Sequence, residues 1–225
     1  MTPTITTTSQ QPYTSPLGNG TFTTTVTVRQ DTNHSCCRQI TATFSLQLTV
    51  AGTTQQQPSN EVGHLIANIV DKTAKVRGKP LWISQLCKNK DNSEVSQQSR
   101  ALFTANGARR PAVRDLAEQL KGDRLVHVET FKIKAQYRNG QGFGRLAIDA
   151  FHAILPLLNG GDAYSGTVLL APGMPLDCRD DYPKMDDEKA ARRLQGVYAG
   201  YGYTVFVDDY AANVRDYIIV MGKIV

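Results

Sequence analysis

The sequence contains no uninterrupted apolar run of the roughly 20 residues that a membrane-spanning helix requires. It also lacks any block of five or more Lys and Arg residues and any basic stretch interleaved with aromatic residues. These absences predict a soluble protein with neither a membrane nor a nucleic acid as its partner. The formal net charge of +5 favours anionic partners only in general terms.

Cysteine is scarce, and its four copies, Cys36, Cys37, Cys87 and Cys178, form no CxxC pair and no His/Cys spacing suited to zinc. We therefore expect no metal site. The adjacent Cys36 and Cys37 are poorly placed to bridge each other, and no signal peptide is recognisable ahead of them. The pattern predicts reduced thiols in a reducing compartment, the cytoplasm, with the nucleus left open.

A chain of 225 residues with 40% hydrophobic residues predicts one substantial core and a single folded domain. Residues 1–20 are mostly Thr, Gln, Ser and Pro, and this composition predicts disorder, so we expect the domain to cover residues 21–225. Residues 21–29, 39–50 and 61–72 alternate apolar with polar residues, a pattern that predicts a meander of half-buried strands.

The second half of the chain alternates helical and strand patterns. Helical spacing appears at 93–103, 110–120, 143–154 and 185–203, and strand patterns appear at 123–137, 165–173, 203–208 and 215–225. In the helix at 143–154, the polar residues Arg145, Asp149 and His152 share one face, which predicts that the opposite face packs on a sheet. The 165–173 strand is apolar enough to be buried on both faces.

A glycine-rich turn at Gly140, Gly142 and Gly144 joins the strand at 123–137 to this helix and is a general anion site. A nucleoside triphosphate would require Lys and Ser or Thr at the end of the loop, where Arg145 and Leu146 stand. A dinucleotide would require an acidic residue at the end of the next strand, which is LLAPG. Coenzyme A is the remaining candidate.

The segment FKIKAQYRNGQGFGRLAIDAF, residues 131–151, resembles the acyl-CoA-binding motif of the GNAT superfamily of N-acetyltransferases, in which a strand, a glycine loop and a helix follow one another. The later segment AARRLQGVYAGYGY, residues 190–203, is similar to that family's late helix. The resemblance implies an α+β fold with a mixed, mostly antiparallel sheet flanked by helices. It covers residues 21–225, most clearly in the second half.

The resemblance implies acetyl-CoA as co-substrate and assigns its binding to the end of the long strand and the glycine loop. The residues concerned are Ile133, whose backbone N–H would contact the thioester carbonyl, Arg138, Asn139, Gly140, Gln141, Gly142, Phe143, Gly144 and Arg145. The loop is one residue longer than the family pattern, because Arg138 precedes Gly142 by four positions. Either Asn139 and Gly140 bulge outward and Gln141 to Gly144 keep the phosphate-binding conformation, or phosphate binding is weakened.

Transfer to an amine also needs proton transfer. The resemblance implies that Tyr198 protonates the leaving thiolate, and it makes Glu129 the first candidate for the base. His127 lies on the same face of the strand and is the second candidate, although a lone strand histidine is more often structural. The acidic stretch around Asp180 and Asp181 suggests a rim that attracts a cationic acceptor.

The expected function is therefore transfer of an acetyl group from acetyl-CoA to a primary amine, directly and within a ternary complex. No Ser or Cys stands in a nucleophile motif. The main alternative is a GNAT-like module that binds acyl-CoA without transferring the acyl group, and a third is a nicotinamide-dependent oxidoreductase. The acceptor amine is not specified by the sequence, and a homodimer is left open.

Overall fold

The computed structural model describes residues 4–15, 18–50, 55–88, 93–138, 142–159, 161–173, 186–209 and 218–225. Its strands are β1 (Ile5–Ser15), β2 (Gly18–Gln30), β3 (Cys37–Leu48), β4 (Asn60–Asp71), β5 (Lys75–Val76), β6 (Lys79–Pro80), β7 (Arg124–Ile133), β8 (Thr167–Leu170), β9 (Thr204–Asp208) and β10 (Ile219–Ile224). Its α-helices are α1 (Glu94–Leu102), α2 (Ala117–Leu120), α3 (Phe143–Ile154) and α4 (Asp187–Gly200).

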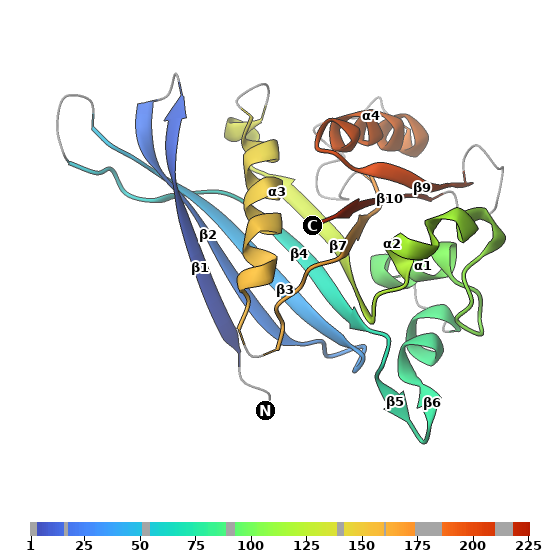
Figure 1. Cartoon of the computed structure of the whole chain (residues 1–225). Coiled ribbons are helices and arrows are strands. Elements are labelled where there is room, and N and C mark those ends of the chain that lie inside the picture. The colour runs from blue at the N-terminus through green and yellow to red at the C-terminus, as the bar shows by residue number, and fades with distance from the viewer. Residues whose placement is uncertain are drawn as a thin grey trace. The chain divides into compact units, whose positions relative to one another are not determined.

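Within these ranges, hydrogen bonding orders one large sheet as β1-β2-β3-β4-β7-β8-β10-β9, and β5 and β6 form a separate ribbon (Figure 1). The β7–β8 pair is parallel, whereas β1–β2, β8–β10 and β9–β10 are antiparallel. The fold is thus α+β with a mixed sheet, and the predicted meander and final strand pair are confirmed. The predicted strand at 123–137 is shorter than expected, because Ala135–Tyr137 turn into a 3-10 helix after Ile133.

The chain divides into two compact units, and each unit is built from three separate stretches of the sequence. The first contains Met1–Arg29, Gln39–Ile66 and Thr130–Ser165, and the second contains Gln30–Arg38, Ala67–Glu129 and Gly166–Val225. The predicted glycine-loop residues belong to the first unit, and the predicted proton-transfer residues belong to the second.

In the first unit, β1 pairs with β2 along its whole length, from Ile5 opposite Val28 to Ser15 opposite Gly18. The expectation that residues 1–20 are disordered is therefore wrong for the described part of that segment. Its threonines suit an extended backbone, since β-branched side chains fit a pleated strand. Tyr13, which is 7% exposed, stacks on Phe143 with ring centroids 5.3 Å apart and gives β1 an apolar anchor.

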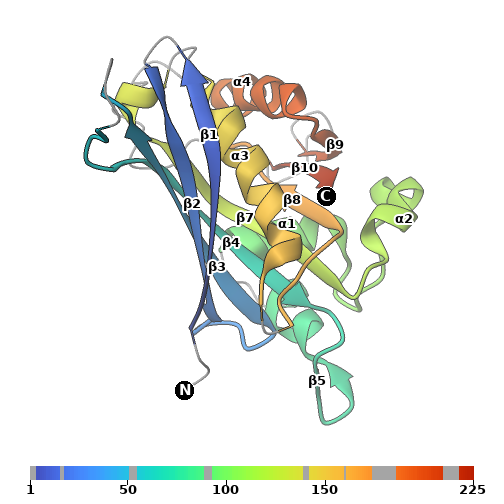
Figure 2. The same cartoon turned by 60° about the vertical axis from the view of Figure 1, so that its left-hand side comes forward.

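Helix α3 lies beside β1 in the first unit (Figures 1 and 2). Most of its predicted apolar face is buried, at Phe143, Ala147, Phe151 and Ile154, while Leu146 and Ala150 are partly exposed. Ile148, which was not predicted for this face, is buried as well. The expectation that His152 belongs to the polar face is wrong, because this residue is only 7% exposed and its ring lies 6.0 Å from that of Phe151. The buried stripe is therefore wider than the sequence pattern indicated.

In the second unit, all four residues of β8 are buried, which confirms the prediction of a strand covered on both faces. Helix α4 packs on β10 and starts at Asp186, whose carboxylate accepts a hydrogen bond from the Lys189 backbone N–H at 2.8 Å. Helix α1 starts at Ser93 in the same way, with the Ser96 backbone N–H as donor at 3.4 Å. Pro111 opens a 3-10 turn that leads into α2, as its position in the sequence predicted.

Candidate functional site

The glycine turn meets α3 at Gly142, which is the residue preceding the helix and has a φ of 73°. This left-handed conformation favours glycine over any residue with a side chain. A Cβ at this position would meet no atom within 4 Å, so the backbone angle and not the space requires glycine here. Asn139, Gly140 and Gln141 lie outside the described residues.

The start of α3 has the features of an anion site. The first N–H groups of any helix have no partner within the helix, and at Phe143 and Gly144 they lie at the positive end of the helix dipole. The Phe143 side chain is only 1% exposed, so this residue could contribute to binding through its backbone alone. Arg145 is exposed, and its Nε lies 3.3 Å from Oδ2 of Asp149, one helical turn later.

Arg138, the other predicted phosphate ligand, folds back on the strand that precedes it. Its Nε donates a hydrogen bond to the carbonyl oxygen of Ile133 at 2.7 Å. This bond joins the end of β7 to the beginning of the glycine loop. In this conformation Arg138 positions the loop.

The end of β7 is also fixed by a close approach of β4. A Cβ at Gly63 would lie 2.2 Å from the Lys132 carbonyl oxygen and 3.0 Å from Cα of Ile133. Directly beyond this contact, the Lys134 N–H donates to the Val62 carbonyl oxygen at 2.8 Å. Gly63 thus holds the backbone at Ile133, the predicted contact for the thioester carbonyl, in its position.

We expect the Gly63→Ala substitution to lower the free energy of unfolding by about 2 kcal/mol, because the new methyl group can be accommodated only if β4 moves away from β7. Urea unfolding followed by circular dichroism measures this change. Gly196→Ala is the matched control, since Gly196 lies in α4 with nothing within 4 Å of the added Cβ. That variant should gain up to about 1 kcal/mol from helix propensity, and an equal loss in both variants would contradict the steric explanation.

His127, the second candidate base, is completely buried in the second unit. Its Nδ1 lies 3.1 Å from Oε1 of Gln98, whose Nε2 donates to the Val128 carbonyl oxygen at 3.0 Å. Burial, and to a lesser extent the positive charge of Lys72, lowers the pKa of His127 to about 3. A neutral, inaccessible imidazole connects β7 to α1, and we remove it from the candidate bases.

Glu129, the first candidate base, is partly exposed on β7 and is held by two hydrogen bonds. The Asn68 side chain and the Val95 backbone N–H both donate to its carboxylate. Burial raises the pKa of Glu129 above its ordinary value, the negative charge of Asp31 raises it further, and the two hydrogen bonds act in the opposite direction. A carboxylate with a raised pKa is a better proton acceptor than an ordinary glutamate.

Tyr198, the predicted proton donor, is half-buried on α4 among other tyrosines. Its ring centroid lies 6.0 Å from those of Tyr201 and Tyr203. Burial, and then the neighbouring Tyr201, raises the pKa of Tyr198 above its ordinary value. The phenol therefore carries its proton at neutral pH, as a proton donor must. Tyr201 and Tyr203 were not among the functional residues predicted from the sequence.

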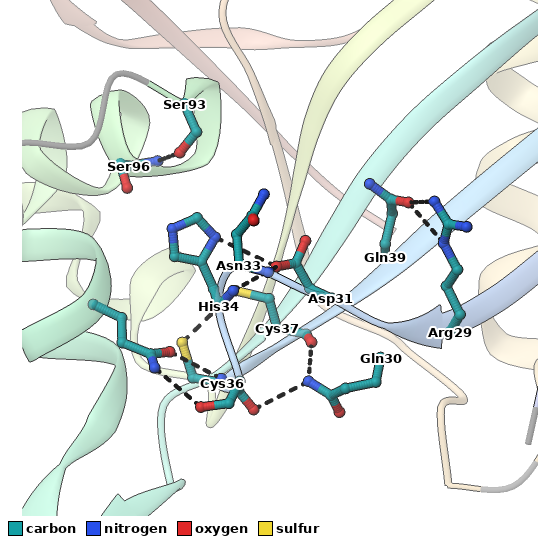
Figure 3. A network of polar contacts seen from close by, with 12 residues as sticks. Arg29, Gln30, Asp31, Asn33, His34, Cys36, Cys37, Gln39, Ser93 and Ser96 are labelled. Atoms are coloured by element: carbon teal, nitrogen blue, oxygen red, sulfur yellow. Dashed lines mark hydrogen bonds and ion pairs between the residues drawn. The ribbon is translucent and has the colours of Figure 1, made fainter. Parts of the chain in front are cut away.

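A polar turn at residues 31–37 is a feature that sequence reasoning missed (Figure 3). The Asp31 carboxylate accepts hydrogen bonds from the backbone N–H groups of Asn33 at 2.7 Å and His34 at 2.5 Å, and it lies 3.6 Å from Nδ1 of His34. Both side chains are less than a tenth exposed. Asp side chains often accept hydrogen bonds from backbone N–H groups a few residues later in a turn. Asp31, two residues before Asn33 and three before His34, is therefore a sequence signal from which this turn could have been predicted.

The cysteines of the described residues, Cys36, Cys37 and Cys87, are buried and form no disulfide. Sγ of Cys36 lies 3.7 Å from Sγ of Cys37, and this contact and burial raise the pKa of Cys37 well above its ordinary range. Burial raises the pKa of Cys87 to about 12. A buried thiol with a raised pKa is a poor nucleophile, so Cys37 and Cys87 are poor candidates for covalent catalysis. Cys178, like Asp180 and Asp181, lies outside the described residues.

Comparison of the chain with family models, with curated proteins and with solved structures finds no match. Among the described residues, no helix has the length and apolar character needed to cross a membrane. The same residues contain no group of three or more His, Cys, Asp or Glu side chains that could hold a metal ion. Function must therefore be inferred from the geometry of each unit and from the resemblance of the motifs.

Proposed function

We propose that this protein is a GNAT-type N-acetyltransferase that transfers an acetyl group from acetyl-CoA to a primary amine. The observation that carries the proposal is the start of α3. A helix opens at a left-handed glycine directly after a strand and turn, so its backbone N–H groups and dipole favour a diphosphate such as that of coenzyme A. Arg138 and Arg145 flank this helix start and supply positive charge.

The strand arrangement also supports the proposal. In the second unit, β7 and β8 pair in parallel, with Val126 opposite Val168 and Val128 opposite Leu170, and the chain between them contains α3. The other pairs described for the second half are antiparallel. This is the mixed, mostly antiparallel sheet that the resemblance implies.

The chemistry assigns one proton acceptor and one proton donor. The amine nitrogen attacks the thioester carbon, the carbon–sulfur bond breaks, the nitrogen loses a proton and the thiolate gains one. In this proposal Glu129 accepts the proton from the amine and Tyr198 protonates the thiolate. The raised pKa of Glu129 makes it a better proton acceptor, and the Tyr198 phenol carries the proton that it would donate.

The first test is the melting temperature with acetyl-CoA, with NADH and ATP as controls. At about 100 times its dissociation constant, acetyl-CoA should add about 2.7 kcal/mol to the free energy of unfolding. Gly142→Ala should lose this increase, because an L-residue strains the left-handed position at the start of α3. Gly161→Ala is the matched control, since Gly161 has a φ of 84° and equally open surroundings but follows the other end of α3.

Equal loss of the acetyl-CoA effect in both variants, or no effect in the wild type, would contradict the proposed binding site. An equal response to NADH would favour the oxidoreductase alternative. Release of free thiol from acetyl-CoA in the presence of an amine separates the enzyme from the binding module, because a module without transfer activity binds acetyl-CoA and releases no thiol.

A further inference from the structure

Positive charge is concentrated in one stretch of the second unit, residues 72–114. This stretch contains ten Lys and Arg residues but only two acids, Asp91 and Glu94, so its net charge is +8. The whole chain has a net charge of +5, which means that the residues outside this stretch are net negative. Such an asymmetry favours an anionic partner that binds at the basic stretch.

The ribbon of β5 and β6 carries three of these cations and projects beyond the end of β4 (Figures 1 and 2). Lys75 lies in β5, Arg77 in the turn and Lys79 in β6, and all three residues are exposed. None of them has an acidic partner in the part of the chain that the structure describes. These three side chains are therefore available to an anion from outside the protein.

The backbone of the ribbon's turn makes Arg77 an unusual residue at its position. Arg77 has a φ of 50° and Gly78 a φ of 76°, so both central residues of the turn are left-handed. Turns of this kind prefer Asn, Asp or Gly, because the left-handed conformation is costly for other residues. Among the described residues, Arg77 is the only residue other than glycine with a positive φ. The turn itself does not account for an arginine here, whereas a role of its cationic side chain in binding does.

A second basic segment, the loop at residues 103–110, lies against the residues that follow the ribbon. The ribbon ends at Pro80, and Trp82 and Ile83 come shortly after it. A Cβ at Gly107 would lie 2.3 Å from Cδ1 of Ile83, and the ring centroids of Trp82 and Phe103 are 5.1 Å apart. The loop therefore packs beside the base of the ribbon.

This loop brings two further exposed cations, Arg109 and Arg110, to the same region. Nη1 of Arg109 donates to the Ala117 carbonyl oxygen at 3.2 Å, and Nε of Arg110 donates to the Phe103 carbonyl oxygen at 3.4 Å. Because these bonds restrain the two side chains, the arginines lose less conformational entropy when they bind an anion. The fold thus gathers cations from two separate segments. The sequence predicted no nucleic-acid partner because these cations form no continuous block.

The composition of this surface favours a nucleic-acid duplex over a protein or a single strand. Val76, which is 52% exposed, is the one large apolar side chain that the described residues expose here. Protein interfaces have an apolar core, whereas interfaces with nucleic acid are polar and positively charged. Trp82 and Phe103 are only 6% and 3% exposed, so their rings cannot stack on unpaired bases. A two-stranded ribbon, in contrast, fits the major groove of duplex DNA.

We propose that Lys75, Arg77, Lys79, Arg109 and Arg110 form a surface that binds the phosphate backbone of a nucleic-acid duplex. Contacts to phosphates give affinity without reading the base sequence. The proposal does not depend on the acetyltransferase function, because none of these residues is assigned to acetyl-CoA binding or to proton transfer.

The experiment is a titration of a short, fluorescently labelled DNA duplex with the full chain, followed by anisotropy at several salt concentrations. We expect binding whose association constant falls as the salt concentration rises. On logarithmic axes the slope should be about −4.5 if all five cations contact phosphates, since each contact contributes about −0.9. An RNA duplex of the same sequence distinguishes the two kinds of duplex, and binding of either one supports the proposal.

Arg77→Gly is the decisive variant, because it removes one cation and also relieves the left-handed strain of the turn. It should weaken duplex binding by about threefold or more and make the salt slope shallower by about one, while its melting temperature does not fall. Lys189→Gln is the matched control, since it removes one positive charge from an exposed site of the same unit, where Lys189 pairs with Asp186 at 2.9 Å. Its dissociation constant should stay within about twofold of the wild type, as expected for a distant screened charge.

Four results would overturn the proposal. They are no binding of either duplex by the wild type, tighter binding of a single strand of the same sequence, equal affinity of the Arg77→Gly and Lys189→Gln variants, and equal binding of polyglutamate, which would indicate an acidic protein as the partner. Arg77→Gly should leave the effect of acetyl-CoA on the melting temperature unchanged. This inference and the proposed function can therefore fail separately.

Discussion

Replacing Phe143 by alanine should lower the free energy of unfolding by about 3–5 kcal/mol, the cost of removing a fully buried aromatic ring. Phe143 is the first residue of α3 and is 1% exposed. Its ring centroid lies 5.3 Å from those of Tyr13 and Tyr137 and 6.5 Å from that of Phe22. The substitution therefore removes contacts with β1, β2 and the turn before the glycine loop.

Chemical denaturation measures this loss, with Leu157→Ala as the control. Leu157 lies in the same unit and is 61% exposed, so its truncation should change the free energy of unfolding by less than about 0.5 kcal/mol. A loss below about 1 kcal/mol for Phe143→Ala would contradict the packing described. Such a result would mean that the Phe143 side chain is accessible and could itself contact a ligand.

The interaction of Phe143 with Tyr13 also shows where sequence reasoning failed. Strand β1 has few apolar residues, and composition alone predicted disorder for it. Its stability comes from the register with β2 and from one aromatic anchor, both of which depend on residues elsewhere in the chain. The other strands of the large sheet were predicted, because their apolar residues recur with a period that burial imposes directly. The short ribbon of β5 and β6 was not predicted, because its residues are exposed and leave no such pattern.

Helix boundaries were predictable where local chemistry determines them. Asp186, Gly142 and Pro111 stand at helix starts, and each acts through its own side chain or backbone angle. The width of the buried face on α3 was not predictable, because His152 is covered by tertiary packing that a polar residue does not signal.

The residues of the candidate site were likewise predictable only where the signal is local in the sequence. The glycine turn and Tyr198 were found from motifs that are local in sequence. The surroundings of Glu129 were not, since the Asn68 side chain and the Val95 backbone N–H that bond its carboxylate come from β4 and α1, which are distant from it in the sequence.

The buried imidazole of His127 should make the protein sensitive to mild acid. An unfolded chain binds a proton at His127 with a pKa near 6.5, whereas the folded protein resists protonation until about pH 3. Between these values the unfolded state holds more protons, so stability falls as the pH falls. At about 1.4 kcal/mol per pH unit, His127 should remove about 3 kcal/mol of stability between pH 6.5 and about pH 4.

Glu94 and Glu129 act in the opposite direction over part of the same range. Their raised pKa values give a stabilising contribution that is fully present below the unfolded value of 4.5 and is lost as the pH rises through the folded values. The wild-type profile is therefore a sum of opposing contributions. A variant that lacks only the imidazole, compared with the wild type at each pH, isolates the contribution of His127.

His127→Phe is that variant, because phenylalanine fills the buried site and does not titrate. It should be less stable than the wild type at neutral pH, since Oε1 of Gln98 loses the ring nitrogen 3.1 Å away. Its stability should decline less on acidification, so the two curves converge towards pH 4. Urea unfolding at half-unit pH steps measures both curves, and parallel curves would mean that His127 accepts a proton in the folded protein and remains a candidate base.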